Sequence, residues 1–277
     1  MTWTFATDVD DFPVPADAWL RRDPVRNTVP LTVLRRIRHG LWNDDLLIGW
    51  YVAGGEVAGV VVHTPPYPLL LGDIPSAAIP ALAEALRDRE LDAVNGPREQ
   101  AEAFTAARGR VPGERVEHRL YRLDTLGAPG AAGGAPRVAG PDDVTAATAW
   151  MEAFLAEAEP NTRAGDVRPQ VEQRVGQGEY VFWEDGGRAV AMAAFSTPVS
   201  GMSRIGPVYT PPELRGRGYG RAVTHAATRA AEDAGADLLL LFTDLANPTS
   251  NSIYQALGYR PIADYAAITF TAAGARV

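Results

Sequence analysis

The sequence predicts an α/β (α+β) protein built as two tandem domains, each with a mixed, mainly antiparallel sheet flanked by helices. Three observations carry this prediction. Strand-like and helix-like segments alternate along the 277 residues, a segment without periodicity divides the chain, and the two halves share a hairpin pattern. Alternation of this kind is typical of sheets covered by helices.

The dividing segment reads GAPGAAGGAP and spans residues 127–136. It contains only glycine, alanine and proline, carries no charge and shows no hydrophobic period, which is typical of a linker. It separates a predicted domain at residues 1–126 from a second one at residues 137–277.

The shared pattern consists of WYVAGGEVAGVVVHTPP, which begins at Trp50, and WEDGGRAVAMAAFSTPV, which begins at Trp183. Each reads as strand, Gly-Gly turn and strand, the signature of a hairpin. Without a gap, Trp50 aligns with Trp183 and Val57 with Val190. Two unrelated hairpins with a common turn would look similar, but the further matches at one offset favour a duplicated fold.

In the first half, local signals set each element. Asn27 is a candidate helix cap and Gly40 a helix stop, and the Gly-Gly turn joins two strands. The predicted elements are a helix at Thr28–His39, strands at Leu46–Ala53 and Val57–Thr64, an apolar segment at Leu69–Leu71, a helix at Ser76–Arg89, a strand at Leu91–Val94, a helix at Pro97–Ala107 and a strand at Arg119–Leu123.

The second half is delimited in the same way. Asp142 and Asp143 favour a helix start through the helix dipole, the run ADLLLLFTD predicts a strand buried on both faces, and Asn247 followed by Pro248 marks a further helix start. The predicted elements are a strand at Arg137–Val138, helices at Asp142–Glu157 and Pro169–Val175, a hairpin at Tyr180–Ser196, a strand at Arg204–Tyr209, a helix at Gly220–Ala234, the strand Ala236–Asp244, a helix from Asn247 to Gly258 and a strand at Ala266–Phe270.

Composition excludes several classes of chemistry. The chain has no cysteine, and all 26 of its Lys+Arg residues are arginine, so thiolate sites and Schiff-base lysines are absent. Its four histidines are scattered, so we expect no metal site. The net charge of −8 argues against nucleic acid as a partner. The N-terminal residues lack a signal peptide pattern, and no run is long enough to span a membrane, so we expect a cytoplasmic protein. The sequence leaves the oligomeric state open.

The most informative stretch is PVYTPPELRGRGYGRAVTHAATRAAEDAG, from Pro207 onward, in which glycines stand where a helix begins. The first amides of a helix lack partners and lie at the positive end of its dipole, so they bind anions. Glycine lets the backbone approach such an anion without a Cβ in the way. We expect a phosphate or diphosphate here, with added positive charge from Arg215, Arg217 and Arg221.

The spacing is neither G-x-G-x-x-G, because Arg221 stands at the third place, nor a P-loop, because the chain has no lysine. The pattern R-x-x-G-x-G, formed by Arg215, Gly218 and Gly220, resembles the acyl-CoA-binding motif of the GNAT superfamily of N-acetyltransferases. A glycine-rich turn without a ligand is the alternative. The cofactor-binding residues that the resemblance implies in this stretch are Val208, Tyr209, Thr210, Arg215, Gly216, Arg217, Gly218, Tyr219, Gly220 and Arg221.

A second stretch, LFTDLANPTSNSIYQALGYRPI, resembles the strand, loop and helix that follow in the same superfamily. The resemblance implies that Asn247 and Asn251 contact the CoA arm and that Tyr254 faces the thioester sulfur. Asn247 alternatively serves as a helix cap alone, and Tyr254 as a packed core residue.

The GNAT resemblance implies that an acetyl group passes from acetyl-CoA to a primary amine by direct attack in a ternary complex. The backbone at Val208–Thr210 would polarise the thioester carbonyl, and Tyr254 would protonate the departing thiolate. Asp244 is our candidate for the general base, with Glu184 and Glu213 as alternatives, and it alternatively only fixes the loop to Asn247. Other readings are an acyl-CoA-binding module without turnover and an acyltransferase for longer acyl groups.

The first half resembles the superfamily in outline only. Where the glycine loop should follow Leu69–Leu71, the sequence gives GDIPSAAIPALAEAL, which lacks the arginine–glycine pattern. Asp73 would repel a diphosphate. We therefore expect a degenerate domain that does not bind CoA. The acceptor, a small-molecule or peptide amine, is not identified by any motif.

Overall fold

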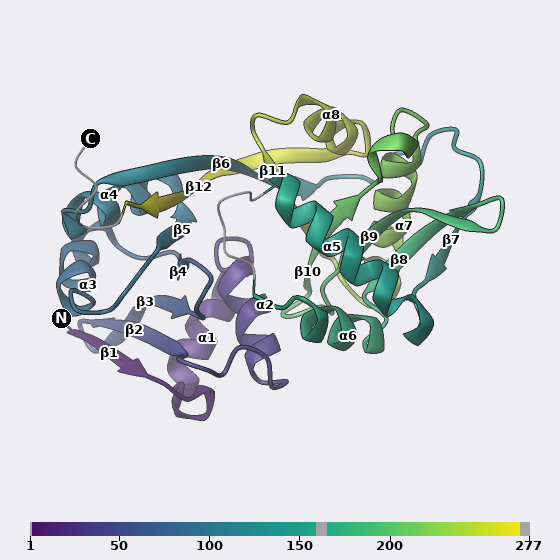
Figure 1. Cartoon of the computed structure of the whole chain (residues 1–277). Helices are drawn as coiled ribbons and strands as arrows, with labels where there is room; N and C mark the ends of the chain where they lie inside the picture. The colour runs from purple at the N-terminus through teal and green to yellow at the C-terminus, as the bar shows by residue number, and fades with distance from the viewer. Residues whose placement is uncertain (1, 159–164, 272–277) are drawn as a thin grey trace. The chain divides into compact units, whose positions relative to one another are not determined.

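The computed structural model describes residues 2–158 and 165–271 (Figure 1). Contacts divide the chain into two compact units. One contains the chain up to His118 and resumes at Ala263, and the other runs from Arg119 to Ile262. These units differ from the contiguous domains predicted at 1–126 and 137–277, because the strands β6 (Pro112–Leu123) and β12 (Tyr259–Phe270) each contribute residues to both units.

The first unit contains a mixed sheet covered on both faces. Neighbouring strands pair antiparallel except for one parallel pair, β4 with β5, and β12 adds to the far side of β5 through residues 265–269. Val60, Val61 and Val62 follow one another in β3 and all are fully buried, which requires cover on each face. The elements are β1 (Thr2–Ala6), η1 (Val9–Asp11), α1 (Val14–Arg22), α2 (Thr28–Ile37), β2 (Leu47–Ala53), β3 (Glu56–His63), β4 (Leu69–Leu71), η2 (Ser76–Ala78), α3 (Ile79–Ala85), β5 (Ala93–Pro97) and α4 (Arg98–Arg108).

The second unit repeats this plan. In the run Ala191–Ala194 of β9, alternate side chains enter two different cores, one beneath α7 and α8 and the other beneath α5 and α6. The alternation follows from the period of a strand, and it shows that helices cover both faces of this sheet. The elements are β7 (Ala135–Val138), η3 (Pro141–Asp143), α5 (Val144–Ala158), α6 (Arg168–Gly176), β8 (Tyr180–Asp185), β9 (Arg188–Phe195), β10 (Met202–Tyr209), η4 (Pro212–Leu214), α7 (Tyr219–Asp233), β11 (Leu238–Asp244) and α8 (Pro248–Ala256).

The duplication extends to the sheet topology. Each half contributes five strands in sequence order, β1 to β5 and β7 to β11, and in each set the last pair is parallel. Both hairpins also contain a bulge two residue pairs before the Gly-Gly turn, at Ala58 in one and Val190 in the other. When the two hairpins are aligned by their turns and bulges, Tyr51 corresponds to Trp183. The ungapped alignment of Trp50 with Trp183 is therefore wrong by one residue. The turn geometry explains the slip, because the paired glycines fix the register.

The sequence did not predict β1 or α1, and it predicted only part of β6 and β12. The prolines Pro13 and Pro15 suggest a loop, yet proline is tolerated in the first turn of a helix, where α1 begins. The first half of β6 is polar and exposed, so its hydrophobic pattern is weak, and pairing with neighbouring strands defines it as a strand.

The predicted linker belongs to the second unit and is held there by hydrogen bonds. The amide of Gly127 donates to the carbonyl of Leu257 at 2.9 Å. The indole Nε1 of Trp183 donates to the carbonyl of Gly133 at 2.7 Å. Residues 127–136 are thus fixed to the C-terminal end of α8 and to β8 within their own unit, although their composition predicts flexibility.

Gly258 ends α8 with a positive φ of 97°, and a Cβ there would lie 1.9 Å from the carbonyl oxygen of Thr125. We expect Gly258→Ala to lower the free energy of unfolding by about 2–5 kcal/mol, because backbone strain of about 1–2 kcal/mol adds to overpacking of about 1–3 kcal/mol. Gly187→Ala is the control: φ is 72° and nothing lies within 4 Å of the added Cβ. Equal losses in urea unfolding of the two variants would contradict the prediction.

Candidate functional site

The site begins where two parallel strands part. β10 and β11 pair from Met202 with Leu238 to Ile205 with Leu241, whereas the strands run on to Tyr209 and Asp244. The opposite edge of β10 stays paired with β9, through Val208 with Ala193 and Tyr209 with Met192. The end of β10 therefore presents its other backbone edge toward the opening next to β11.

A bulge in β10 coincides with the point of parting. The register between β9 and β10 shifts between Ile205 and Val208. The two residues in the shift are Gly206, with a φ of 140°, and Pro207, which has no amide to donate. A bulge bends its strand and re-aims the residues that follow, so it directs Val208 to Thr210 away from the line of the parallel pair.

The glycine loop follows the end of β10 and leads into α7. Gly216 and Gly218 have φ values of 77° and 84°, which glycine adopts without strain. Gly218 is the N-cap of α7 and offers no side chain to its first amides. The first helical bond runs from the amide of Ala222 to the carbonyl of Gly218 at 3.1 Å. The amides of Tyr219, Gly220 and Arg221 precede it and are the groups that bind anions at a helix start.

The side chains of the three loop arginines contact protein groups. Arg215 donates through Nε to the carbonyl of Thr210 at 2.9 Å, and through Nη2 to both carboxylate oxygens of Glu157 at 2.9 and 2.7 Å. Arg221 donates to the carbonyl of Ala128 at 2.7 Å. Arg217 makes a long contact, 3.5 Å, with the carbonyl of Glu213 and also interacts with the side chain of Tyr219.

These contacts give Arg215 and Arg221 structural roles, and the predicted role of adding charge around the anion stays a prediction. Arg215 fastens the loop to the end of β10 and to α5, and Arg221 fastens α7 to the linker. Glu157 was not predicted as a site residue, because 58 residues separate it from Arg215 and no sequence pattern connects them.

Two tyrosines flank the glycine loop: Tyr209 ends β10 and Tyr219 begins α7. Tyr209 lies beneath Trp150 of α5, with ring centroids 6.2 Å apart, and burial followed by the charge of Glu157 raises the pKa of its hydroxyl. The hydroxyl of Tyr219 donates to the carboxylate of Asp185, and this bond raises the pKa of Tyr219. The side chain of Tyr219 thus joins α7 to β8, and only its backbone amide belongs to the loop.

The residues after β11 form a compact turn. Asn247 caps α8, since its Oδ1 accepts the amide of Ser250 at 3.0 Å. Asp244 Oδ1 accepts the amide of Ala246 at 2.7 Å, so this carboxylate fixes the turn. Asn251 donates to the carbonyls of Asp244 and Asn247 at 2.9 and 2.7 Å and accepts from the hydroxyl of Tyr121 at 2.8 Å. Asn251 therefore joins the turn to β6.

Tyr254 lies on the inner face of α8 and is 8% exposed. It belongs to the core beneath α7 and α8, against which Val208 also packs, and its ring centroid lies 6.4 Å from that of Tyr259. Burial raises the pKa of Tyr254 to about 12. Its hydroxyl therefore keeps its proton at neutral pH, as a proton donor requires.

The sequence model of the acetyltransferase (GNAT) family matches residues 146–259, from α5 to the first residue of β12. Residues 146–259 are a GNAT acetyltransferase domain. Transfer of an acetyl group from acetyl-CoA to an amine is the general activity of this family. No curated protein matches this sequence.

Solved structures agree on the fold. A GNAT-family acetyltransferase from Colwellia psychrerythraea superposes with a TM-score of 0.62 at 12% identity, covering 98% of this chain and 100% of its own. A GCN5-related N-acetyltransferase from Kribbella flavida gives 0.56 at 20% identity, over 82% and 90%. A tandem GNAT protein from the clavulanic acid biosynthesis pathway gives 0.58 at 15% identity, over 96% and 98%. The prediction of two tandem GNAT-like domains is confirmed.

The first unit replaces the glycine loop with a closed turn. Asp73 follows β4, pairs with Arg26 at 2.9 Å, and offers its amide to Asn27 Oδ1 at 3.2 Å. Its carboxylate also accepts a long bond from Gln100 at 3.4 Å. A carboxylate thus stands where the GNAT domain has glycine amides, and it disfavours an anion at this position.

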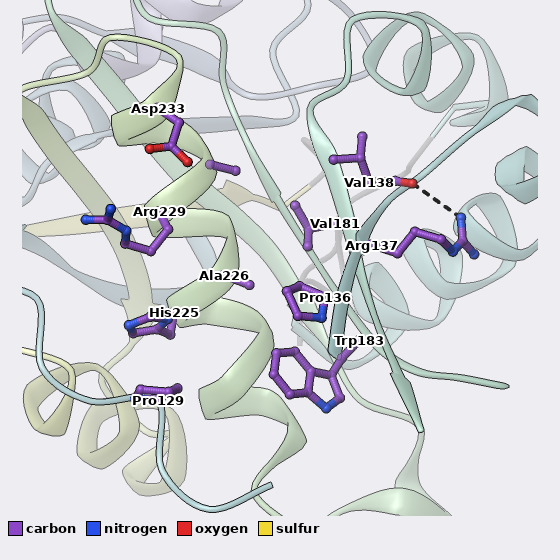
Figure 2. A pocket seen from close by; sticks show the side chains of 11 residues that line it. Pro129, Pro136, Arg137, Val138, Val181, Trp183, His225, Ala226, Arg229 and Asp233 are labelled. Atoms are coloured by element: carbon purple, nitrogen blue, oxygen red, sulfur yellow. Dashed lines mark hydrogen bonds between the residues drawn. The ribbon is translucent and has the colours of Figure 1, made fainter. Parts of the chain in front are cut away.

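A pocket of about 440 Å³ flanks α7 in the GNAT domain (Figure 2). It is lined by the linker, β7, β8 and the middle of α7, with Trp183, Val181 and Ala226 supplying apolar surface. His225 also lines it, and burial lowers the pKa of this histidine. The residues predicted for the CoA site are not among its lining, so this pocket is separate from the parted strands.

Glu184 and Glu213, the alternative candidates for the general base, belong to β8 and to the turn η4 before the glycine loop. Glu184 pairs with Arg137 at 2.8 Å beside the edge strand β7, and Glu213 is exposed in the turn before the loop. Across residues 2–158 and 165–271, no three or more potential ligand side chains gather into a metal site. No helix within the same residues is both long and apolar enough to cross a membrane.

Because burial raises the pKa of Tyr254, we expect the protein to lose stability at alkaline pH. Between pH 10 and about 12 the unfolded chain releases this proton while the folded chain retains it, so the free energy of unfolding falls as pH rises, by about 1.4 kcal/mol per pH unit. Tyr254→Phe should make this decline shallower by that slope. Urea unfolding at pH 9.5, 10.5 and 11.5 measures it, and parallel curves for the two proteins would contradict the assigned shift.

Proposed function

We propose that the GNAT domain transfers an acetyl group from acetyl-CoA to a primary amine. One observation carries the proposal: the start of α7 lies against the end of β10, where a Cβ on Gly220 would lie 3.5 Å from Thr210 Oγ1. A diphosphate at the amides of residues 216–221 would lead the pantetheine arm into that opening. The arm would then pair with the backbone edge of Val208 to Thr210, which β9 leaves available.

The chemistry proceeds by direct attack in a ternary complex. The amine nitrogen attacks the thioester carbon, and an amide at the end of β10 stabilises the oxyanion. The carbon–sulfur bond then breaks, and Tyr254 gives its proton to the departing thiolate. The amine loses a proton in the same cycle, and a proton returns to Tyr254. Because the chain has no cysteine, it cannot form a cysteine acyl-enzyme.

Asp244 is the proposed acceptor of the amine proton. It lies at the end of β11, on the opposite strand of the opening from Val208. One of its oxygens holds the turn through Ala246, so the carboxylate is fixed in place. In this proposal the turn orients Asp244 and the same group acts as base, directly or through water.

Main-chain groups carry most of the proposed cofactor contacts. The backbone of Val208, Tyr209 and Thr210 and the amides from Gly216 to Arg221 bind acetyl-CoA, while Arg215 and Asn251 hold the loop and the turn in place through their side chains. Asn247 combines capping of α8 with a contact to the CoA arm. The first unit, which lacks the loop, supports the fold and does not bind CoA.

The partner is a small-molecule or peptide amine in the cytoplasm. An acyl-CoA-binding module without turnover is a second candidate, favoured by the structural use of Asp244, one of whose oxygens accepts the amide of Ala246. Release of free thiol from acetyl-CoA with a panel of amines separates the two. Acceleration by any amine establishes a transferase, and binding without acceleration by the whole panel favours the module.

Gly220 allows a direct test of the anion site. A Cβ there would lie 3.5 Å from Thr210 Oγ1 and 3.9 Å from Ile253 Cδ1, which are ordinary contacts. Gly220→Glu should weaken acetyl-CoA binding about 100-fold or more, because a like charge beside the diphosphate costs several kcal/mol. Gly220→Gln has the same size without the charge and should lose about tenfold or less. If calorimetry gives the two variants equal dissociation constants for acetyl-CoA, the diphosphate does not bind at this loop.

Tyr254→Phe tests the proton donor. Turnover should fall about 100-fold, the low end of what general acid catalysis contributes, while the acetyl-CoA dissociation constant changes about threefold or less. Tyr259→Phe is the matched control, because this tyrosine shares the same core and its hydroxyl bonds to Thr228 at 2.8 Å. A turnover of Tyr254→Phe equal to that of the control would exclude the acid role.

A further inference from the structure

A buried ion pair lies behind the bulge of β10 and has no part in the chemistry proposed above. Arg174 of α6 and Glu179, which precedes β8, pair at 2.8 Å, and both side chains are 2% exposed. The guanidinium also lies over the ring of Tyr180, 5.0 Å from its centroid. A charge pair so buried loses its hydration, so its remaining hydrogen-bonding groups need fixed partners.

Those partners are the backbone groups next to the bulge. Arg174 Nη2 donates to the carbonyl of Phe195, the last residue of β9, and to the carbonyl of Gly206, the first bulged residue of β10, both at 3.1 Å. Glu179 Oε1 accepts the amide and the hydroxyl of Thr197 at 2.7 and 2.8 Å. The pair therefore joins both strands at the point where their register breaks.

The bulge requires such donors. Pro207 has no amide, and the register between β9 and β10 skips Gly206 and Pro207, so the ladder does not supply a regular partner for the carbonyl of Gly206. A buried carbonyl without a donor is costly. The guanidinium of Arg174 donates to this carbonyl, and its donors lie in one rigid plane. A lysine ammonium does not reproduce this arrangement.

We propose that Arg174 and Glu179 are positioning residues that hold the bulge of β10 and thereby set the opening between β10 and β11. The pair acts through Gly206 on the three residues that follow, Val208 to Thr210, and does not touch the substrates. The effect of the pair on acetyl-CoA rests on the proposed function, whereas its effect on the conformation of β10 does not.

The test uses the full chain and replaces both partners together. Exchange of a buried ion pair for two apolar residues often leaves stability unchanged, whereas removal of one partner destabilises strongly. R174M/E179M therefore removes the donors while it preserves the packing. R168M/E172M is the matched control, because Arg168 and Glu172 form an ion pair at 2.8 Å on the same helix with both side chains 50% exposed.

Amide hydrogen exchange of the ligand-free protein is the first measurement. We expect the amides of Val208 and Tyr209 that are hydrogen-bonded to β9 to exchange tenfold or more faster in R174M/E179M than in the wild type, with Leu239 to Leu241 of β11 and the control variant unchanged. Rates at these paired amides within threefold of the wild type, in a variant with an unchanged melting temperature, would overturn the proposal.

Calorimetric titration with acetyl-CoA is the second measurement. R174M/E179M should bind at least tenfold more weakly than the wild type and the control should bind equally. If the wild type itself does not bind, the proposed function fails while the exchange result still decides the positioning role.

Should R174M/E179M fail to fold, R174K is measured in the same way. This variant keeps a positive charge next to Glu179 but loses the planar set of guanidinium donors. Failure of R174K to fold as well would assign the pair to folding and reject the positioning role.

Discussion

The parting of β10 from β11 is the constraint on which the rest of the site depends. Parallel strands satisfy each other's backbone groups only while they stay in register, and this register ends at Ile205 and Leu241. Beyond that point the backbone of β10 has one paired edge and one edge toward the opening. The helices that follow the two strands, α7 and α8, place their first residues at this end of the sheet, which brings the loop amides, Asp244 and Tyr254 into one region of the GNAT domain.

In the proposed function, backbone amides bind the anion and side chains hold the loop, which is compatible with an acidic protein. The chain carries a net charge of −8, yet the loop needs little local positive charge when helix amides and the helix dipole supply it. The arginines then serve as structural donors: Arg215 to Thr210 and Glu157, Arg221 to Ala128. Deep in the domain, Arg174 does the same for Phe195 and Gly206. A guanidinium suits this use because it offers several donors in a fixed plane.

The two units share one fold plan but differ in the loop at which we propose that the second unit binds acetyl-CoA. Both have the same strand order and the same parallel pair at the end of the set. In the first unit the turn after β4 carries Asp73, held by Arg26 and Asn27, and lacks the arginine–glycine pattern of the loop after β10. Preservation of the core keeps the fold, because burial depends on hydrophobic pattern, whereas the site depends on a few residues in one loop.

The sequence by itself determined the class of fold, the duplication and the position of the glycine loop, because hydrophobic period, glycine turns and helix caps are local signals. It did not determine the units, since pairing partners far along the chain decide where β6 and β12 belong. It also could not assign side chains such as Arg215, Arg221 and Asn251 to their partners, nor reveal Glu157 or the Arg174–Glu179 pair. Those contacts join residues that are distant in sequence, and only the packing of helices on the sheet brings a guanidinium within reach of a carbonyl.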